Sequence, residues 1–124
     1  MCDTVFIDFM EFFKGETDAR IVADGQEVFR EGEPGDNMYV ILAGQVEIKV
    51  GGKYVDAVGE GSIVGEMALL GDSPRSATAV AMGECRLVVI NQERFLGLVK
   101  QTPEFAINVM RMMADRLRGM NMLL

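Results

Sequence analysis

VGEMALLGDSPRSATAV, residues 64–80, combines a glycine, a short helical segment, a turn and a strand. Gly65 opens the segment, and residues 66–70 have the composition of one helical turn. Residues 71–74 are of turn-forming types, and residues 77–80 alternate as a strand does. Glycine lets a backbone approach a ligand closely, and the start of a helix presents unpaired N–H groups to an anion.

Two charged side chains in this segment point to a ligand that carries both a phosphate and a sugar. Arg75 has a planar, permanently charged guanidinium group that suits phosphate oxygens. Glu66 falls in the first helical turn, where its carboxylate can accept hydrogen bonds from hydroxyl groups. On the residues alone, the alternative is a plain turn with an exposed arginine and no ligand.

The sequences GEMALL (residues 65–70) and PRSAT (residues 74–78) closely resemble the phosphate-binding cassette of cyclic nucleotide-binding domains. This family includes catabolite activator proteins and the regulatory subunits of cyclic-nucleotide-dependent kinases. Residues 31–48, EGEPGDNMYVILAGQVEI, are similar to the glycine–aspartate turn of the family and the strand pair that follows it. The resemblance extends from about residue 27 to residue 117. It departs at Val64, a position that is often aromatic in the family.

This resemblance implies a binding site for cAMP or cGMP and gives a role to each matching residue. Glu66 is expected to accept a hydrogen bond from the ribose 2′-OH, and Arg75 to pair with the cyclic phosphate. The backbone N–H groups of Ala68 and Ser76 are expected to reach phosphate oxygens. The Ser76 hydroxyl can donate to the phosphate or accept from the amino group of a guanine base. The predicted ligand-binding set is Gly65, Glu66, Met67, Ala68, Arg75, Ser76 and Ala77. No catalytic residue, metal ligand or cofactor other than the nucleotide is expected.

Length and composition are typical of one cytoplasmic domain over residues 1–124. A chain of 124 residues, 49% of them hydrophobic, can bury a core without disulfides or metals, and intrinsic disorder is excluded. No apolar run reaches the roughly 20 residues that cross a bilayer, and we expect no secretory signal and no membrane partner. Cys2 and Cys85 have no disulfide-framework spacing, which fits a reducing compartment.

The charge is acidic, with 12 basic and 19 acidic residues and a net charge of −7. Residues 1–90 hold 7 basic and 16 acidic residues, a balance of −9, which argues against a nucleic-acid partner. An anionic ligand must therefore be held locally by Arg75 and oriented N–H groups. Histidine is absent, which excludes histidine triads and histidine metal clusters. We expect no enzymatic activity.

Short alternating segments separated by glycine turns predict an antiparallel barrel or sandwich. The predicted strands are residues 20–23, 27–30, 38–42, 45–50, 54–58, 62–64, 77–81 and 85–90. We place a bulge or tight bend at Gly44, a two-residue hairpin at Gly51-Gly52 and a turn at Gly83-Glu84. The resemblance implies that the fold is mainly β, a jelly-roll barrel of eight antiparallel strands over about residues 20–90. Residues 4–13 predict an N-terminal helix packed against it.

Two C-terminal helices are predicted over about residues 91–122. Asn91 can cap the first, and Thr102-Pro103-Glu104 provides a cap, a first-turn proline and an acid for the second. One apolar stripe of the second helix is expected to pack on the barrel: Phe105, Val109 and Met112. The other is Ala106, Met110, Met113, Leu117, Met120 and Leu124, spaced 4, 3, 4, 3 and 4.

That spacing is a heptad pattern, and a helix that is apolar on two sides needs two partners. We therefore predict a homodimer through this helix or its contact with an effector protein. The alternative is that the second stripe also faces the barrel. By the resemblance, Met120 and Asn121 near the end of the helix fall close to positions that contact the base.

The sequence as a whole predicts a regulatory module that binds cAMP or cGMP and changes the packing of its C-terminal helix when it does. Two other hypotheses stay open. The chain could be an interaction protein that keeps the jelly roll but no longer binds nucleotide, or an enzyme in which Glu66 and Asp72 act as paired carboxylates. No DNA-binding, kinase or channel segment is recognisable in the chain, so we expect the effector to lie outside it.

Overall fold

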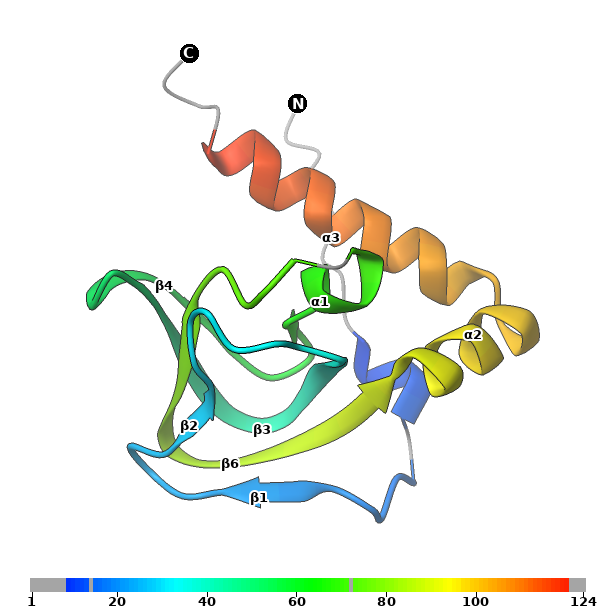
Figure 1. Ribbon diagram of the computed structural model, residues 1–124. Coiled ribbons are helices and arrows are strands. Elements are labelled where there is room, and N and C mark those ends of the chain that lie inside the picture. Colours follow the sequence, from blue (N-terminus) through cyan, green and yellow to red (C-terminus); the bar gives the residue numbers. More distant parts are fainter. Residues whose placement is uncertain (1–8, 14, 72, 121–124) are drawn as a thin grey trace, which may run out of the picture.

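The computed structural model describes residues 9–13, 15–71 and 73–120, and it shows an antiparallel jelly-roll barrel flanked by helices (Figure 1). In chain order, the elements are η1 (Phe9–Phe13, a 3-10 helix), β1 (Arg20–Val22), β2 (Glu27–Phe29), β3 (Asn37–Val50), β4 (Lys53–Val58), β5 (Ile63–Val64), α1 (Met67–Leu70), β6 (Thr78–Asn91), α2 (Gln92–Gln101) and α3 (Glu104–Met120). The predicted fold class is therefore confirmed. In Figure 1, α3 lies across the end of the barrel where α1 is found.

The strands β3 and β6 organise the sheet because they pair along most of their length, from Asn37↔Asn91 to Lys49↔Thr78. The strand order is β1-β6-β3-β4, with β2 also paired to β6 and β5 to β3. The sheet of the described residues has six strands, whereas eight were predicted. The difference arises because two predicted strand pairs each form one continuous strand.

The first of these joins lies at Gly44, where β3 bends. Gly44 has a φ of +93°, and the register between β3 and β6 shifts on both sides of Ala43. A Cβ atom at Gly44 would lie 2.6 Å from the carbonyl oxygen of Glu84, so the close approach of the two strands requires glycine. The predicted bulge is confirmed, but it bends one strand and does not separate two.

The second join lies at Gly83, where a turn was predicted and the structure shows a continuous β6. Gly83 has a φ of +73°, so the backbone does bend at this point. The N–H group of Gly83 donates to the Asp24 carboxylate over 2.8 Å. Because this side chain satisfies a backbone donor at the bend, the strand continues through Gly83 without ending.

Two other local predictions are confirmed. Val50 pairs with Lys53 across the hairpin formed by Gly51 and Gly52, both at positive φ, as a two-residue turn requires. Asn91 caps α2, and its side-chain oxygen accepts from the Arg94 N–H group over 2.8 Å.

The core consists of two hydrophobic clusters. One fills the barrel and includes Val22, Val28, Phe29, Tyr39, Ile41, Val46, Val64 and Leu87. The other joins the barrel to η1, α2 and α3, and Phe105 lies at its centre with ring centroids 5.2–6.3 Å from Phe9, Phe12, Phe13 and Phe95. Burying an aromatic side chain of this kind contributes roughly 1.5–3 kcal/mol, so this cluster fixes the start of α3 to the barrel.

The described part of the N-terminal segment, η1, is a 3-10 helix that packs against the barrel as predicted. Phe9 and Phe13 of η1 are buried in the second cluster, and the Phe9 N–H group donates to Gly61 O over 2.8 Å. Residues 4–8 of the predicted helix lie outside the described residues. No helix in the described part of the chain is long and apolar enough to cross a membrane.

The two stripes of α3 have different outcomes. Phe105 and Val109 are buried against the barrel, and Met112 packs partly on it, as predicted. In the second stripe Met110 and Leu117 are 59% and 58% exposed. The prediction was wrong for Met113, which packs partly on the second core cluster because α3 lies close to the barrel there. Ile107 joins the exposed line instead, while Asn121 and Leu124 lie outside the described residues.

Candidate functional site

The segment between β5 and β6 is shaped by a glycine at its start. Gly65 has a φ of +78°, and a Cβ atom there would lie 2.7 Å from Arg75 Nη1. Only glycine therefore lets the arginine come against the backbone at this position. Glu66 follows with helical backbone angles, and α1 continues for a single turn before Gly71.

Glu66 and Arg75 are the buried charged residues of the described chain, 5% and 7% exposed. Both line a cavity of about 1080 Å³. Its walls come from β2, β3, β4, the segment after β5 and the second half of α3. Ligand sites for small molecules typically measure about 300–1,000 Å³, so this cavity is large enough for one.

Arg75 is held by neutral groups. Its Nη1 atom donates to Gly65 O over 3.1 Å and its Nη2 atom to Asn37 O over 2.8 Å. The guanidinium carbon lies 4.2 Å from the centroid of the Phe29 ring. Within the described residues, two of the five guanidinium N–H groups thus have acceptors, and three remain for an anion.

Glu66 pairs with Arg116 of α3, which the sequence analysis did not identify as a site residue. Arg116 also donates to Ile63 O over 2.6 Å and to Ser62 Oγ over 3.4 Å. Arg116 therefore links the C-terminal helix α3 to β5 and to the residues on either side of it. No motif marks it in the sequence, and its role depends on how α3 is oriented across the barrel.

The other residues of the predicted set lie around the same cavity: Gly65, Met67, Ala68, Ser76 and Ala77. The Ala68 N–H group, expected to face phosphate, donates to Gly65 O over 3.2 Å inside the α1 turn. Ser76 is exposed at the edge of the cavity. Asp72, the partner in the enzyme hypothesis, lies outside the described residues.

Two further carboxylates line the cavity, Asp56 from β4 and Asp115 from α3, which forms an ion pair with Arg118. With Glu66 they give three negative charges against the positive charges of Arg75 and Arg116. A bound anion therefore depends on these two arginines and on nearby N–H groups, because the surrounding charge opposes it.

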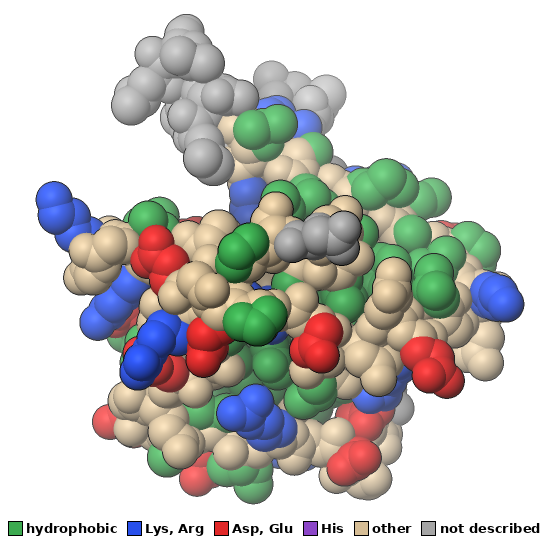
Figure 2. Space-filling view, viewed as in Figure 1, with side chains coloured by type: hydrophobic (Ala, Val, Ile, Leu, Met, Phe, Trp, Pro, Cys, Tyr) green, Lys and Arg blue, Asp and Glu red, His purple; other side chains and the backbone are tan. Residues whose placement is uncertain are grey.

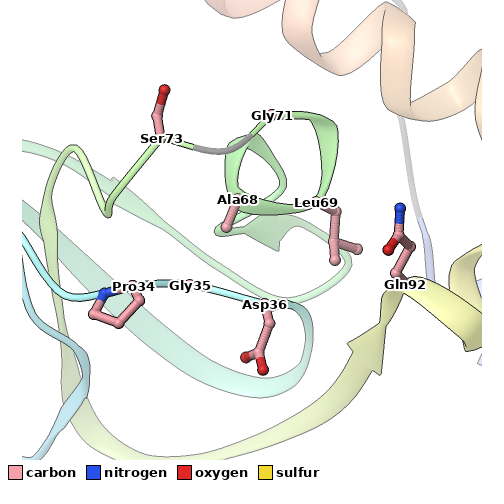
Figure 3. Close-up of a pocket in the computed structure, with 8 residues that line it drawn as sticks. All are labelled: Pro34, Gly35, Asp36, Ala68, Leu69, Gly71, Ser73 and Gln92. Atoms are coloured by element: carbon pink, nitrogen blue, oxygen red, sulfur yellow. The ribbon is translucent and has the colours of Figure 1, made fainter.

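A smaller cavity of about 280 Å³ lies beside α1 (Figure 3). It is lined by Pro34, Gly35, Asp36, Ala68, Leu69, Gly71, Ser73 and Gln92. Neither Glu66 nor Arg75 lines it, so the larger cavity is the candidate ligand site. Gly35 nevertheless adjoins the site, since a Cβ atom there would lie 2.5 Å from Arg75 Nε.

A jelly-roll barrel whose cavity presents a buried carboxylate and a buried arginine from one glycine-rich segment defines a class of ligand-binding domain. The model of the family described as cyclic nucleotide-binding domain matches residues 19–102, more than half of this chain. The chain belongs to this family.

Three similar proteins illustrate the relationship. The cyclic AMP receptor protein of Thermus thermophilus is 33% identical over 104 residues, 80% of this chain and 48% of that protein. The crystal structure of the Thermus thermophilus catabolite activator protein has a TM-score of 0.79 at 27% identity, covering 97% of this chain and 59% of that one. The EAL enzyme Bd1971 in its cAMP-bound form has a TM-score of 0.62 at 32% identity, covering 82% of this chain and 29% of that one.

A cGMP-bound form of Bd1971 is also similar, with a TM-score of 0.63 at 31% identity, covering 84% of this chain and 29% of that one. The matched segment covers less than half the length of the cyclic AMP receptor protein. The relationship therefore concerns one domain of that relative.

Proposed function

We propose that this chain is a regulatory module that binds cAMP or cGMP in the 1080 Å³ cavity and acts by binding alone, without catalysis. The observation that carries the proposal is the presence of two buried charged side chains, Glu66 and Arg75, on one cavity. Arg75 has no carboxylate partner among the described residues, whereas Glu66 is paired with Arg116. A ligand with an anionic phosphate and sugar hydroxyls offers Arg75 a charged partner and Glu66 a further hydrogen-bond donor.

Arg75 is the proposed phosphate partner. Three of its N–H groups have no acceptor among the described residues, and a planar guanidinium group forms paired hydrogen bonds with phosphate oxygens. The bond from Ala68 N–H to Gly65 O must lengthen or become shared if this donor also reaches the phosphate. Ser76 at the edge of the cavity supplies a hydroxyl that can donate to the phosphate or accept from a guanine amino group.

Glu66 is the proposed acceptor for the ribose 2′-OH. In the structure its carboxylate is paired with Arg116 of α3. A ligand that hydrogen-bonds to Glu66 would therefore lie beside the ion pair that holds this helix. Ligand binding would change the balance between the Glu66–Arg116 pair and ligand contacts, and so the packing of α3. This coupling is how the module would transmit its signal.

The ligand is proposed to be either cyclic nucleotide. The similar protein Bd1971 has both a cAMP-bound and a cGMP-bound form, which supports a fold that accepts either base. In this chain the Ser76 hydroxyl can serve a phosphate or a guanine amino group, so it does not restrict the choice. We expect cAMP to be favoured by no more than about tenfold.

A homodimer through α3 is the proposed assembly. Ile107, Met110 and Leu117 form an exposed apolar line on this helix, and hydrophobic side chains gather over it in Figure 2. Their spacing of three and seven residues matches the heptad period of a helix pair. A second copy of the helix would cover this line.

Isothermal titration calorimetry with cAMP and cGMP tests the proposal. Arg75→Ala should weaken binding by about 2–5 kcal/mol, because a desolvated phosphate loses its charged partner. The matched control is Arg30→Ala, which removes the same charge from an exposed side chain outside the cavity and should leave affinity unchanged.

Two results would contradict the proposal. If the unmodified protein binds neither nucleotide, the interaction-protein hypothesis is the better one. If it binds but Arg75→Ala changes the dissociation constant by less than about threefold, Arg75 is not the phosphate partner.

A further inference from the structure

We infer that Phe29 is a positioning residue, whose ring holds the Arg75 guanidinium in the orientation that receives the phosphate. This inference rests on the proposed function. Phe29 ends β2, is 9% exposed and lines the ligand cavity. Its side chain carries no polar group that could pair with a phosphate, and it contacts the proposed phosphate partner, Arg75.

The geometry shows a cation resting on an aromatic surface. The Arg75 guanidinium carbon lies 4.2 Å from the Phe29 ring centroid and 5.9 Å from that of Tyr39. The two rings are inclined by only 23°, with centroids 6.1 Å apart. These three distances place the guanidinium over both rings, with Phe29 as the nearer support. A contact of this kind contributes more when the cation is desolvated, as Arg75 is.

Arg75 needs such support because no carboxylate pairs with it among the described residues. Its side-chain hydrogen bonds go to the neutral carbonyl groups of Gly65 and Asn37. The electron-rich face of the ring therefore offsets part of the cost of burying the charge. In the free protein, the ring therefore stabilises the buried guanidinium charge, as the ligand phosphate would do after binding.

The contacts around the guanidinium also restrict where it can go. Gly35 leaves no room for a Cβ atom, which would lie 2.5 Å from Arg75 Nε and 2.7 Å from its Cζ. With this backbone and the Phe29 ring both in contact, the arginine is ordered before the ligand arrives. Without the ring, a long side chain regains rotamer freedom and must be ordered at the expense of affinity.

The test compares Phe29→Leu, Phe29→Tyr and Phe95→Leu by calorimetry with cAMP and with cGMP. Phe95→Leu is the matched control, because Phe95 packs on Phe105 and does not line the cavity. Phe29→Leu should weaken binding about tenfold, while Phe29→Tyr, which keeps the ring, should stay within about twofold. In an Arg75→Ala background, Phe29→Leu should have less than about a twofold effect, since its action passes through the arginine.

A second measurement separates positioning from packing. Replacing Phe29 with pentafluorophenylalanine keeps an apolar ring of similar shape but reverses the electrostatics of its face. Affinity should fall about as far as with leucine, whereas the same replacement at Phe95 should not alter it. This variant keeps the inference testable if Phe29→Leu does not fold.

NMR of the unliganded protein provides a readout that does not depend on nucleotide binding. The Arg75 δ-methylene protons should be shifted by the Phe29 ring current in the unmodified protein and should return toward ordinary values in Phe29→Leu. If no nucleotide binds, the proposed function fails and this shift still decides whether Phe29 contacts Arg75. If nucleotide binds but the Phe29 variants behave like those at Phe95, or keep their full effect without Arg75, the inference is overturned.

Discussion

Substituting Arg116 with methionine tests how much the Glu66–Arg116 ion pair stabilises the protein, apart from the apolar packing of α3. Methionine keeps a flexible apolar stem of similar length but loses the guanidinium group. In the unmodified protein this group pairs with Glu66 and donates to Ile63 O and Ser62 Oγ. After the substitution, Glu66 keeps a buried carboxylate without its charged partner.

The magnitude follows from the burial of the two side chains. Breaking a buried pair costs about 3–5 kcal/mol when the remaining charge is fully enclosed. The Arg116 side chain is 32% exposed and that of Glu66 is 7% exposed, so solvent screens part of the interaction. We expect Arg116→Met to lower the free energy of unfolding by about 2 kcal/mol.

Urea unfolding followed by far-UV circular dichroism at a fixed protein concentration measures this loss. The control is Arg118→Met, which removes a more exposed arginine on the same helix and should cost less than about 0.5 kcal/mol. In the unmodified protein, Glu66→Gln should be destabilising because it removes the ion pair with Arg116. In the Arg116→Met variant, the same substitution should be neutral or stabilising, because it removes a buried charge that is already unpaired.

Equal effects of the two arginine substitutions would refute this account of α3. The same conclusion would follow if Glu66→Gln cost as much with Arg116→Met as without it. In either case the pair would contribute no net stability, and α3 would be held by its apolar contacts alone.

Three other predictions test separate features. In urea unfolding, Gly44→Ala should destabilise the protein by about 3–4 kcal/mol, because the alanine would have a positive φ and its Cβ atom would overlap the facing backbone. Gly83→Ala has only the positive φ and should destabilise it by about 1–2 kcal/mol. Equal losses of stability would contradict the close approach of the strands at Gly44. Ser76→Ala should weaken cGMP more than cAMP in calorimetry, and equal losses would mean that the hydroxyl serves the phosphate alone. Met110→Glu with Leu117→Glu should give a folded monomer in sedimentation velocity, and an unmodified protein that is monomeric at high micromolar concentration would contradict the proposed dimer.

Local signals predicted most of the elements of the fold. The hairpin at Gly51-Gly52 and the cap at Asn91 depend on neighbours in the sequence, and both occur where predicted. The number of strands does not follow from such signals. Glycines at positions 44 and 83 mark bends in both cases, but only the facing strand and Asp24 determine that the ladder continues through each of them.

The residues of the candidate site also fall into two groups, those that the sequence identifies and those that only the tertiary structure reveals. Residues of the segment after β5 could be identified because they are consecutive and match a family pattern, and the structure places the predicted set on one cavity. Arg116 and Phe29 reach that cavity from distant parts of the chain. Their residue types are ordinary in a helix and a strand, so only tertiary packing reveals their contacts with Glu66 and Arg75.

The aromatic cluster around Phe105 has a mechanical consequence for α3. It clamps the helix near its first turn, while the Glu66–Arg116 pair holds it eleven residues further on. At 1.5 Å per residue this separation is about 16 Å, so the helix is a lever with its pivot at the aromatic end. A tilt of only about 10° around Phe105 would carry Arg116 through roughly 3 Å, enough to break a hydrogen bond. A rearrangement beside Glu66 would therefore reach the exposed line from Ile107 to Leu117 as a tilt, smallest at Ile107 near the clamp and largest at Leu117.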